Sequence, residues 1–308
     1  MATPDIYSEF DRLSSLPDSL LCSNILSRLP LLDAVRSSIL APKWRYLWTK
    51  IPHLHFSPDF FRHVIVSVGN SSRLIEDTME HILIQHDVPL ESFGFHLPET
   101  VRSTTIGIHQ CLHYAAQKGV KRMALVFNNT NFMRMPLPFT FFSCTTLVEI
   151  ELIGFAIPEI PTPSENFSFL IRTFCLCDVG NLTDQRLQRL VELCPLLEEL
   201  LLIKCEELTH MKIQASNLTY LLLVGCSHVE SLTADCPQLL QLKIRNCSLL
   251  AELQLESYGL VELKLMECRT LSKLRLNSCV FLKKVGSFEG LSIQGHGNVE
   301  ALRKFSIK

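Results

Sequence analysis

The sequence predicts an α/β fold in which a small helical module precedes a solenoid of parallel strands. Cys205, Cys226, Cys247 and Cys268 follow one another at intervals of 21 residues. Each closes a copy of the phrase L-x-x-L-x-L-x-x-C, with isoleucine for the third leucine in one copy. This is the leucine-rich-repeat phrase, which contributes one short strand per unit. A unit cannot bury its own leucines, so neighbouring units must stack around a continuous core.

A second apolar phrase lies halfway between successive cysteines. The segment that carries it is too short and too strand-like for a good helix. We therefore predict a second, short parallel sheet on the opposite face of these C-terminal repeats, closer to a β-solenoid than to a helix-backed horseshoe. The second phrase occupies Leu208/Met211/Ile213, Val229/Leu232/Ala234, Leu250/Leu253/Leu255 and Leu271/Leu274/Leu276.

Composition limits the classes of protein to consider. With 308 residues, 47% of them hydrophobic, the chain can bury a large core as one extended solenoid or with a small extra domain. The net charge of −2 gives no electrostatic footprint for nucleic acid. No apolar run approaches the length of a membrane span, and residues 1–12 lack the apolar segment of a signal peptide. The 12 cysteines are too few for a disulfide scaffold in a chain of this length, and the four of the repeat act as small buried hydrophobes, which favours the cytoplasm, the nucleus or both.

The N-terminal region predicts a disordered leader over residues 1–10 and three short helices over residues 11–51. Pro30 ends the first helix, a second spans residues 33–40 with Asp33 able to cap it, and Pro42 suits the first turn of a third. Helices this short bury too little surface to be robust alone, so the module needs a partner or the solenoid beside it. Apolar residues at helical spacing in the first helix are Leu21, Cys22, Ile25, Leu26 and Leu29.

A series of short blocks in this region is specific in order and spacing. The blocks resemble the F-box of plant F-box/leucine-rich-repeat proteins of the FBD type, and with the repeats the resemblance covers nearly the whole chain. They are Leu16-Pro17-Asp18, Ile25-Leu26, Leu29-Pro30, Ala34-Val35-Arg36, Ser38-Ile39-Leu40 and Lys43-Trp44-Arg45-Tyr46-Leu47-Trp48.

The chain departs from this pattern in three places. One residue is inserted at Cys22-Ser23-Asn24, which turns the preceding helical face by about 100° and leaves Leu20 without a clear role. The stripe of Leu21, Ile25 and Leu29 tolerates that shift. Leu31-Leu32 stands where polar residues are usual, and Ala41-Pro42 replaces the usual Ser-Lys.

The resemblance implies the substrate-recognition subunit of a Skp–cullin–F-box ubiquitin ligase. Residues 11–51 would dock on a Skp-type adaptor and through it on cullin, and the solenoid over residues 52–308 would hold an unknown target protein. The alternative is a leucine-rich interaction scaffold outside any ligase, because of the altered first helix. For Trp44 the sequence leaves core packing and adaptor contact about equal. Residues expected to bind the adaptor are Leu16, Pro17, Leu21, Ile25, Leu26, Leu29, Val35, Trp44, Leu47 and Trp48.

The early repeats are longer and less regular. They predict helices over residues 74–85, 106–118 and 184–193, with Gly119 closing the second and Thr183 opening the third. A proline-rich loop spans residues 158–163, and after Cys279 the phrase decays into Gly286, Gly290, Gly295 and Gly297 before a last strand over residues 299–307. The phrase recurs at Leu90/Phe93/Phe95, Val120/Met123/Leu125, Leu147/Ile150/Leu152 and Ile171/Phe174/Leu176.

We find no motif for catalysis, a metal or a cofactor, and do not expect an enzyme. His109 and His113 lie one helical turn apart, but glutamine stands where a zincin needs glutamate. Cys175 and Cys177 share one side of an extended strand, which does not suit a metal knuckle. A hydrolase built on the solenoid has no motif to support it, although the sequence does not test a triad assembled from distant segments.

The repeat register predicts where a target protein binds. Residues that flank the last leucine of each phrase point away from the core. Six consecutive outward positions are apolar, and a basic rim follows. The opposite sheet gives polar pairs, such as Lys212/Gln214. Cover by the C-terminal segment or by the loop at 158–163 is about as well supported as target binding. The expected target-binding residues are Cys175, Cys177, Leu201, Ile203, Leu222 and Val224, with Lys243, Arg245 and Lys264 as the rim.

Overall fold

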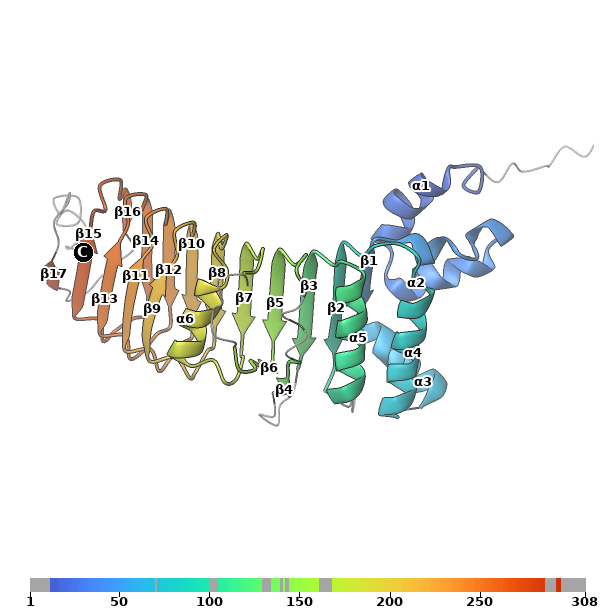
Figure 1. Cartoon of the computed structure of the whole chain (residues 1–308), viewed down its shortest axis with the longest axis horizontal. Helices are drawn as coiled ribbons and strands as arrows, with labels where there is room; N and C mark the ends of the chain where they lie inside the picture. Colours follow the sequence, from blue (N-terminus) through green and yellow to red (C-terminus); the bar gives the residue numbers. More distant parts are fainter. Residues whose placement is uncertain are drawn as a thin grey trace, which may run out of the picture.

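The chain forms an elongated solenoid with a helical module at its N-terminal end, as the computed structural model in Figure 1 shows. The structure describes residues 12–69, 71–99, 105–128, 134–138, 141, 144–160, 168–285 and 292–294. The expected leader, the last strand at 299–307, the glycines from Gly286 to Gly297 and residues 161–163 of the proline-rich loop lie outside this range.

The helical module consists of short helical turns. They are α1 (Asp18–Leu20), η1 (Leu21–Ile25), η2 (Leu26–Arg28), α2 (Leu31–Arg36), η3 (Ser37–Ile39), η4 (Pro42–Trp44) and η5 (Leu47–Lys50). Pro42 occupies the first turn of η4, as predicted, although η4 and η5 are 3₁₀ turns and not one α-helix. The expected boundary at residues 51/52 falls between η5 and the first strand.

A π-helical turn, η1, lies in the first helix where the sequence predicts an extra residue. A π turn closes its hydrogen bonds over five residues and an α-helix over four, so the π turn holds more residues. Leu21 and Leu26 therefore both reach the core, and Leu20 is 44% exposed. The stripe is shorter than predicted, because Leu29 follows the end of the helix and is 41% exposed.

The second helix begins two residues earlier than predicted. Pro30 stands at its N-cap position with ψ 142°, and Asp33 lies inside the first turn without capping it. Asp33 instead forms an ion pair with Arg36, at 3.3 Å. The prediction that Asp33 caps this helix was wrong.

In the described residues, ten parallel strands form the main sheet, in the order β1-β2-β3-β5-β7-β8-β10-β12-β14-β16. Their inward residues are buried, including Leu125, Leu223 and Ile244. The sequence analysis missed β1, which pairs with β2. The strands are β1 (His53–Phe56), β2 (Ser92–Leu97), β3 (Arg122–Phe127), β5 (Glu149–Ile153), β7 (Thr173–Cys177), β8 (Glu199–Ile203), β10 (Tyr220–Val224), β12 (Gln241–Arg245), β14 (Glu262–Met266) and β16 (Lys284–Val285).

Helices lie behind the early strands. They are α3 (Pro58–Val68), which was not predicted, α4 (Ser72–Gln85), α5 (Thr105–Gln117) and α6 (Asp184–Glu192). The Thr183 hydroxyl accepts a hydrogen bond from the Arg186 amide and so caps α6, as predicted. Gly119 follows α5 with φ +71°, the left-handed conformation expected of a glycine C-cap.

The C-terminal repeats have the predicted second parallel sheet in place of helices. It contains β9 (His210–Gln214), β11 (Ser231–Asp235), β13 (Glu252–Glu256), β15 (Lys273–Asn277) and β17 (Ser292–Gln294). A small pair, β4 (Met135–Pro136) and β6 (Phe155–Ala156), lies behind the middle repeats. The repeated cysteines also form hydrogen bonds between coils. The Cys226 thiol, for example, donates to the Leu202 carbonyl of the preceding coil, at 3.5 Å. A small side chain with a weak donor suits this position.

From β5 to β14, each coil turns a corner after its main-sheet strand in the left-handed conformation. Gly154 and Gly225 occupy this corner with φ +77° and +66°, and Lys204, Asn246 and Glu267 adopt the same conformation in other coils. The amides of Gly154, Lys204, Gly225 and Asn246 each donate to the end of the next strand; the Gly225 amide, for example, donates to the Arg245 carbonyl at 2.8 Å. The corners thus connect neighbouring coils as well as reversing the chain.

Candidate interaction surfaces

Five of the predicted adaptor-binding residues lie in the core of the helical module. Leu21, Leu26, Trp44, Leu47 and Trp48 are at most 6% exposed. This corrects the expectation that they form an outer surface. A module this small needs its largest apolar side chains inside to fold at all.

Trp44 shows how this core is closed. Its indole N–H donates to the Ser14 hydroxyl at 2.8 Å, and the neighbouring Lys43 ammonium donates to the Ser14 carbonyl at 2.7 Å. The segment before α1 is thereby held against η4, and Trp44 takes the core role that the sequence left open. Leu16, Ile25 and Val35 are half-buried against the same core, while Pro17 and Leu29 are exposed.

The outer surface of the module presents other apolar side chains. Ile39 is 85% exposed, Leu40 70% and Tyr46 66%. Sequence reasoning did not select these three as site residues. The signal in the sequence was the Ser38-Ile39-Leu40 block. Its two adjacent apolar residues do not follow the spacing of a helical face that packs against a core.

The junction between module and solenoid is held by hydrogen bonds to the backbone before β1. A ring nitrogen of His86 lies 2.5 Å from the Ile51 carbonyl, and the Asp87 amide donates to the Thr49 carbonyl at 3.0 Å. The Glu91 amide donates to Pro52, at 2.8 Å. Burial lowers the pKa of His86, which favours the neutral imidazole. These contacts fix the module on the first coil.

The predicted apolar face is present on the outer side of the main sheet. Cys175, Leu201 and Leu222 are partners in one register row, and Cys177, Ile203 and Val224 are partners in the next. All six side chains are half-buried, whereas the residues between them point into the core. We call these six residues the apolar patch. Among the described residues, no segment buries it fully.

The basic rim follows on the next two strands. Lys243 and Lys264 continue the row of Leu222, and Arg245 continues the row of Val224. The Lys243 ammonium lies 5.0 Å from the centre of the Tyr220 ring, and Lys264 pairs with Glu262 at 2.9 Å. Arg245 is exposed and forms no ion pair with a described residue.

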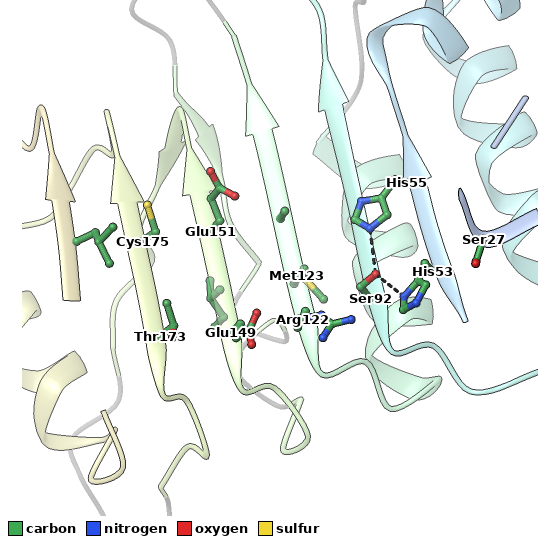
Figure 2. A pocket seen from close by; sticks show the side chains of 13 residues that line it. Ser27, His53, His55, Ser92, Arg122, Met123, Glu149, Glu151, Thr173 and Cys175 are labelled. Carbon is green, nitrogen blue, oxygen red and sulfur yellow. Dashed lines mark hydrogen bonds between the residues drawn. The ribbon is translucent and has the colours of Figure 1, made fainter. Parts of the chain in front are cut away.

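A groove of about 690 Å³ hollows the same face at its N-terminal end (Figure 2). It is lined by His53, His55, Ser92, Arg122, Glu149 and Glu151, and it extends to Cys175 and Leu201 of the apolar patch. Sequence reasoning missed the groove because it missed β1, which supplies the histidines. The available signal was the pair of small outward residues on β2 and β3.

Those small residues, Gly94 and Ala124, explain the hollow. They are partners at outward positions of adjacent strands. A Cβ on Gly94 would lie 2.7 Å from His55 Nδ1 and 2.7 Å from the Ala124 carbonyl oxygen. Only glycine fits there without displacing the backbone or the imidazole. The floor of the groove is therefore free of large side chains between His55 and Glu151.

Ser92 lies between two imidazoles in the groove, as Figure 2 shows. His53 Nδ1 and His55 Nε2 each lie 3.0 Å from the Ser92 hydroxyl. Burial lowers the pKa of His55, with smaller contributions from His53 and Arg122, so its imidazole is neutral near pH 7. A serine–histidine hydrolase needs a third group to orient the base. No carboxylate of a described residue hydrogen-bonds either imidazole.

The other candidate chemistry leads to no site in the described residues. His109 contacts the Pro136 carbonyl at 3.2 Å, and His113 contacts Gln117. Cys175 and Cys177 share one face of β7, as predicted. Within the described ranges, no three His, Cys, Asp or Glu side chains gather as metal ligands, and none of the helices there has the length and apolarity of a membrane span.

Comparison with known families decides what kind of protein this is. Residues 108–274, more than half of the chain, match the model for the leucine-rich repeats of FBD-associated F-box protein At5g56370. The chain is a plant F-box/leucine-rich-repeat protein. Its matched region begins within α5 and ends within β15, so it covers the apolar patch and β9, β11 and β13 of the second sheet.

Other F-box/leucine-rich-repeat proteins match at low identity. The chain is 30% identical to F-box/FBD/LRR-repeat protein At1g13570 of Arabidopsis thaliana over 68% of its own length and 48% of the relative's. It is 29% identical to F-box/FBD/LRR-repeat protein At5g56420 of the same plant over 63% of its length and 44% of the relative's. F-box/LRR-repeat protein 25 of Arabidopsis thaliana is 28% identical over 69% of the chain and 75% of the relative. The chain thus spans less than half the length of the first two relatives.

Proposed function

We propose that this chain is the substrate-recognition subunit of a Skp–cullin–F-box ubiquitin ligase. The observation that supports it is a pair of separate apolar surfaces on one anchored body. One is the outer face of the helical module, and the other is the apolar patch on the sheet. The chain would supply proximity, and catalysis would belong to other subunits of the ligase. We place this activity in the cytoplasm, the nucleus or both.

The module surface suits a permanent partner. Ile39, Leu40 and Tyr46 are all more than half exposed, whereas both tryptophans of the module are buried in its core. Soluble proteins rarely leave clustered apolar side chains uncovered without a use. Aromatic and aliphatic residues of this kind form the centres of protein interfaces. We therefore assign these three residues, with Pro17 and Leu29, to adaptor contact, and assign the buried five to holding that surface in shape.

Co-purification with a recombinant Skp-type adaptor tests the adaptor contact. Ile39→Asp with Leu40→Asp should reduce adaptor capture at least tenfold, since a charge buried without a partner in an interface costs several kcal/mol. Leu16→Ala with Pro17→Ala should weaken capture without unfolding the solenoid. The matched control is Val66→Asp on α3, because Val66 is 86% exposed but lies outside the module.

The scaffold alternative has one observation in its favour, the π turn in the first helix. If the wild-type chain captures none of the Skp-type adaptors offered, the ligase assignment fails and the scaffold takes its place. Capture by wild type and by Val66→Asp, with loss in the Ile39/Leu40 variant, supports the ligase.

The apolar patch is the proposed centre of the target site, with Lys243, Arg245 and Lys264 as its basic rim. Leu201→Asp with Leu222→Asp should abolish target capture and leave adaptor capture intact, because the two surfaces lie on different parts of the chain. The measurement is proximity labelling by the adaptor-bound chain, wild type against variant. If the double variant loses its folded circular-dichroism signal, the patch belongs to the core and the assignment is wrong.

A further inference from the structure

On the outer face of the main sheet, acidic and basic residues lie at opposite ends of the apolar patch. The proposed target site includes only the basic end. Along the row through Leu201, the outward residues are Ala124 on β3, Glu151 on β5, Cys175, Leu201, Leu222, and then Lys243 and Lys264. An acidic residue therefore borders one end of the apolar patch, and basic residues border the other end.

The acidic end is open to a ligand. Glu149 and Glu151 both line the groove, both are exposed, and neither forms an ion pair with a described residue. Glu151 stands where the groove meets the patch, close enough to Cys175 that its carboxylate, after burial, helps raise the pKa of that thiol. Arg122 also lines the groove and lies 4.0 Å from Glu91.

The basic end is open as well. Arg245 is exposed and has no acidic partner among the described side chains, and Lys243 is held only over the Tyr220 ring. Lys264 forms an ion pair with Glu262. The groove hollow, the apolar patch and this basic end together form one continuous track across the strands.

We propose that the track binds an extended segment of a partner protein that carries a lysine or arginine, then aliphatic or aromatic residues, then an aspartate or glutamate. The basic side chain enters the groove beside Glu151, the apolar residues cover Leu201 and Leu222, and the acidic side chain meets Lys243 and Arg245. This inference deepens the proposed target site and depends on that site being a binding surface.

The geometry sets the spacing of the segment. Four strand steps separate β5 from β12, and at about 4.8 Å per step the two charged ends are about 19 Å apart. An extended chain advances about 3.3 Å per residue. The basic and acidic residues of the segment should therefore be about six positions apart. The interior strands of the sheet are paired on both sides, so the segment crosses them through side chains and does not join as a strand.

Selection from a displayed library of random peptides tests the proposal on the full chain. The peptides should be about twelve residues long, enough to span the track. We expect wild-type chain to enrich a basic residue and an acidic residue about six positions apart, with apolar residues between. Glu151→Lys should bind the wild-type-selected peptides at least tenfold more weakly, because like charges then face each other. A peptide with its basic residue changed to glutamate should regain binding to this variant.

Matched controls come from the second sheet. Glu256→Lys on β13 makes the same charge change, and Lys212→Glu on β9 makes the opposite one, both at outward positions of the opposite face. Neither should alter the selection. Enrichment without charge order, no enrichment at all, or an equal loss in the control variants would each overturn the proposal. Self-association that Glu151→Lys abolishes would also overturn it, by assigning the track to a second copy of the chain.

This experiment does not depend on the ligase. Charge-ordered selection by a chain that captures no Skp-type adaptor would uphold the track and refute the ligase assignment. Adaptor capture without charge-ordered selection would do the reverse.

Discussion

The two halves of the solenoid share one main sheet but differ in what lies behind it. In the C-terminal half, paired residues of β8, β10, β12 and β14 are 21 positions apart at every step. In the N-terminal half, the coils that carry helices advance by 39, 30 and 26 positions. A coil of 21 residues with two five-residue strands has no room left for a helix. A coil this short therefore excludes a helix from its back.

The same difference governs the outer face. The short coils repeat so regularly that apolar and basic residues align in rows, whereas the longer coils place small residues and histidines together and leave a groove.

The largest effect should come from removing a core leucine from each half. Leu223 and Leu125 are both fully buried. Leu223→Ala and Leu125→Ala should each lower the free energy of unfolding by about 2–5 kcal/mol. In a repeat array, neighbouring coils carry most of the coupling. Hydrogen exchange should accordingly rise in β8–β12 for Leu223→Ala, and in β2–β5 for Leu125→Ala. A loss well below 1 kcal/mol at Leu223 would mean that the repeat register is wrong.

The regular C-terminal half of the solenoid could be predicted from the sequence more fully than the irregular N-terminal half. Ile213, Leu223, Ile244 and Leu265 are buried as the register predicts, at no more than 3% exposed. The second sheet was predicted because its phrase shares the 21-residue step. In contrast, β1 and α3 were missed, because the first coil is 39 residues long and offers no second copy to align with.

The site was predictable only where repetition placed it. The apolar patch follows from the register alone, since outward positions alternate with buried leucines. The groove depends on which strands are neighbours and on the missing side chain of Gly94, neither of which a spacing pattern contains. In the helical module, the resemblance located the F-box, but the inside and outside of turns this short depend on tertiary packing. That is why Trp48 was expected at the surface and the role of Trp44 was left open, although both lie in the core.

A smaller loss of stability should result from replacing the corner glycines, and it should differ between the two halves of the solenoid. Gly154 and Gly225 occupy equivalent corners, but a Cβ on Gly154 would lie 2.0 Å from the Phe127 carbonyl oxygen, and one on Gly225 would contact only a Lys204 side-chain carbon, at 3.5 Å. Gly225→Ala should cost about 1–2 kcal/mol for the left-handed conformation alone. Gly154→Ala should cost clearly more, because the backbone must also move.

Thermal denaturation of both corner variants measures this difference. Gly225→Asn is the control, and it should be milder than Gly225→Ala because asparagine tolerates this conformation and Asn246 already adopts it in the next coil. Equal losses at Gly154 and Gly225 would show that the close approach to Phe127 does not constrain the corner.

Thiol reactivity should distinguish the outer face from the core. Burial raises the pKa of Cys175 to about 11 and that of Cys194 to about 12. The thiolate is the reactive form, so a raised pKa slows labelling at pH 8, and the rate should rise about tenfold per pH unit up to the thiol pKa. Cys175 is half-exposed and should label slowly in the folded chain. The buried Cys205, Cys226 and Cys247 should label only on unfolding, which mass spectrometry of the labelled chain can check.

The smallest effect should come from outward positions, even apolar ones. Leu222 and Leu223 are adjacent in β10, yet Leu222 faces outward and is half-buried while Leu223 is fully buried. Leu222→Ser should therefore change the free energy of unfolding by less than about 1 kcal/mol, and Lys212→Ala and Arg275→Ala on the second sheet by about 0.5 kcal/mol or less. Urea denaturation of these variants beside Leu223→Ala provides the measurement. If Leu222→Ser costs as much as Leu223→Ala, the apolar patch serves stability and is not kept for a partner.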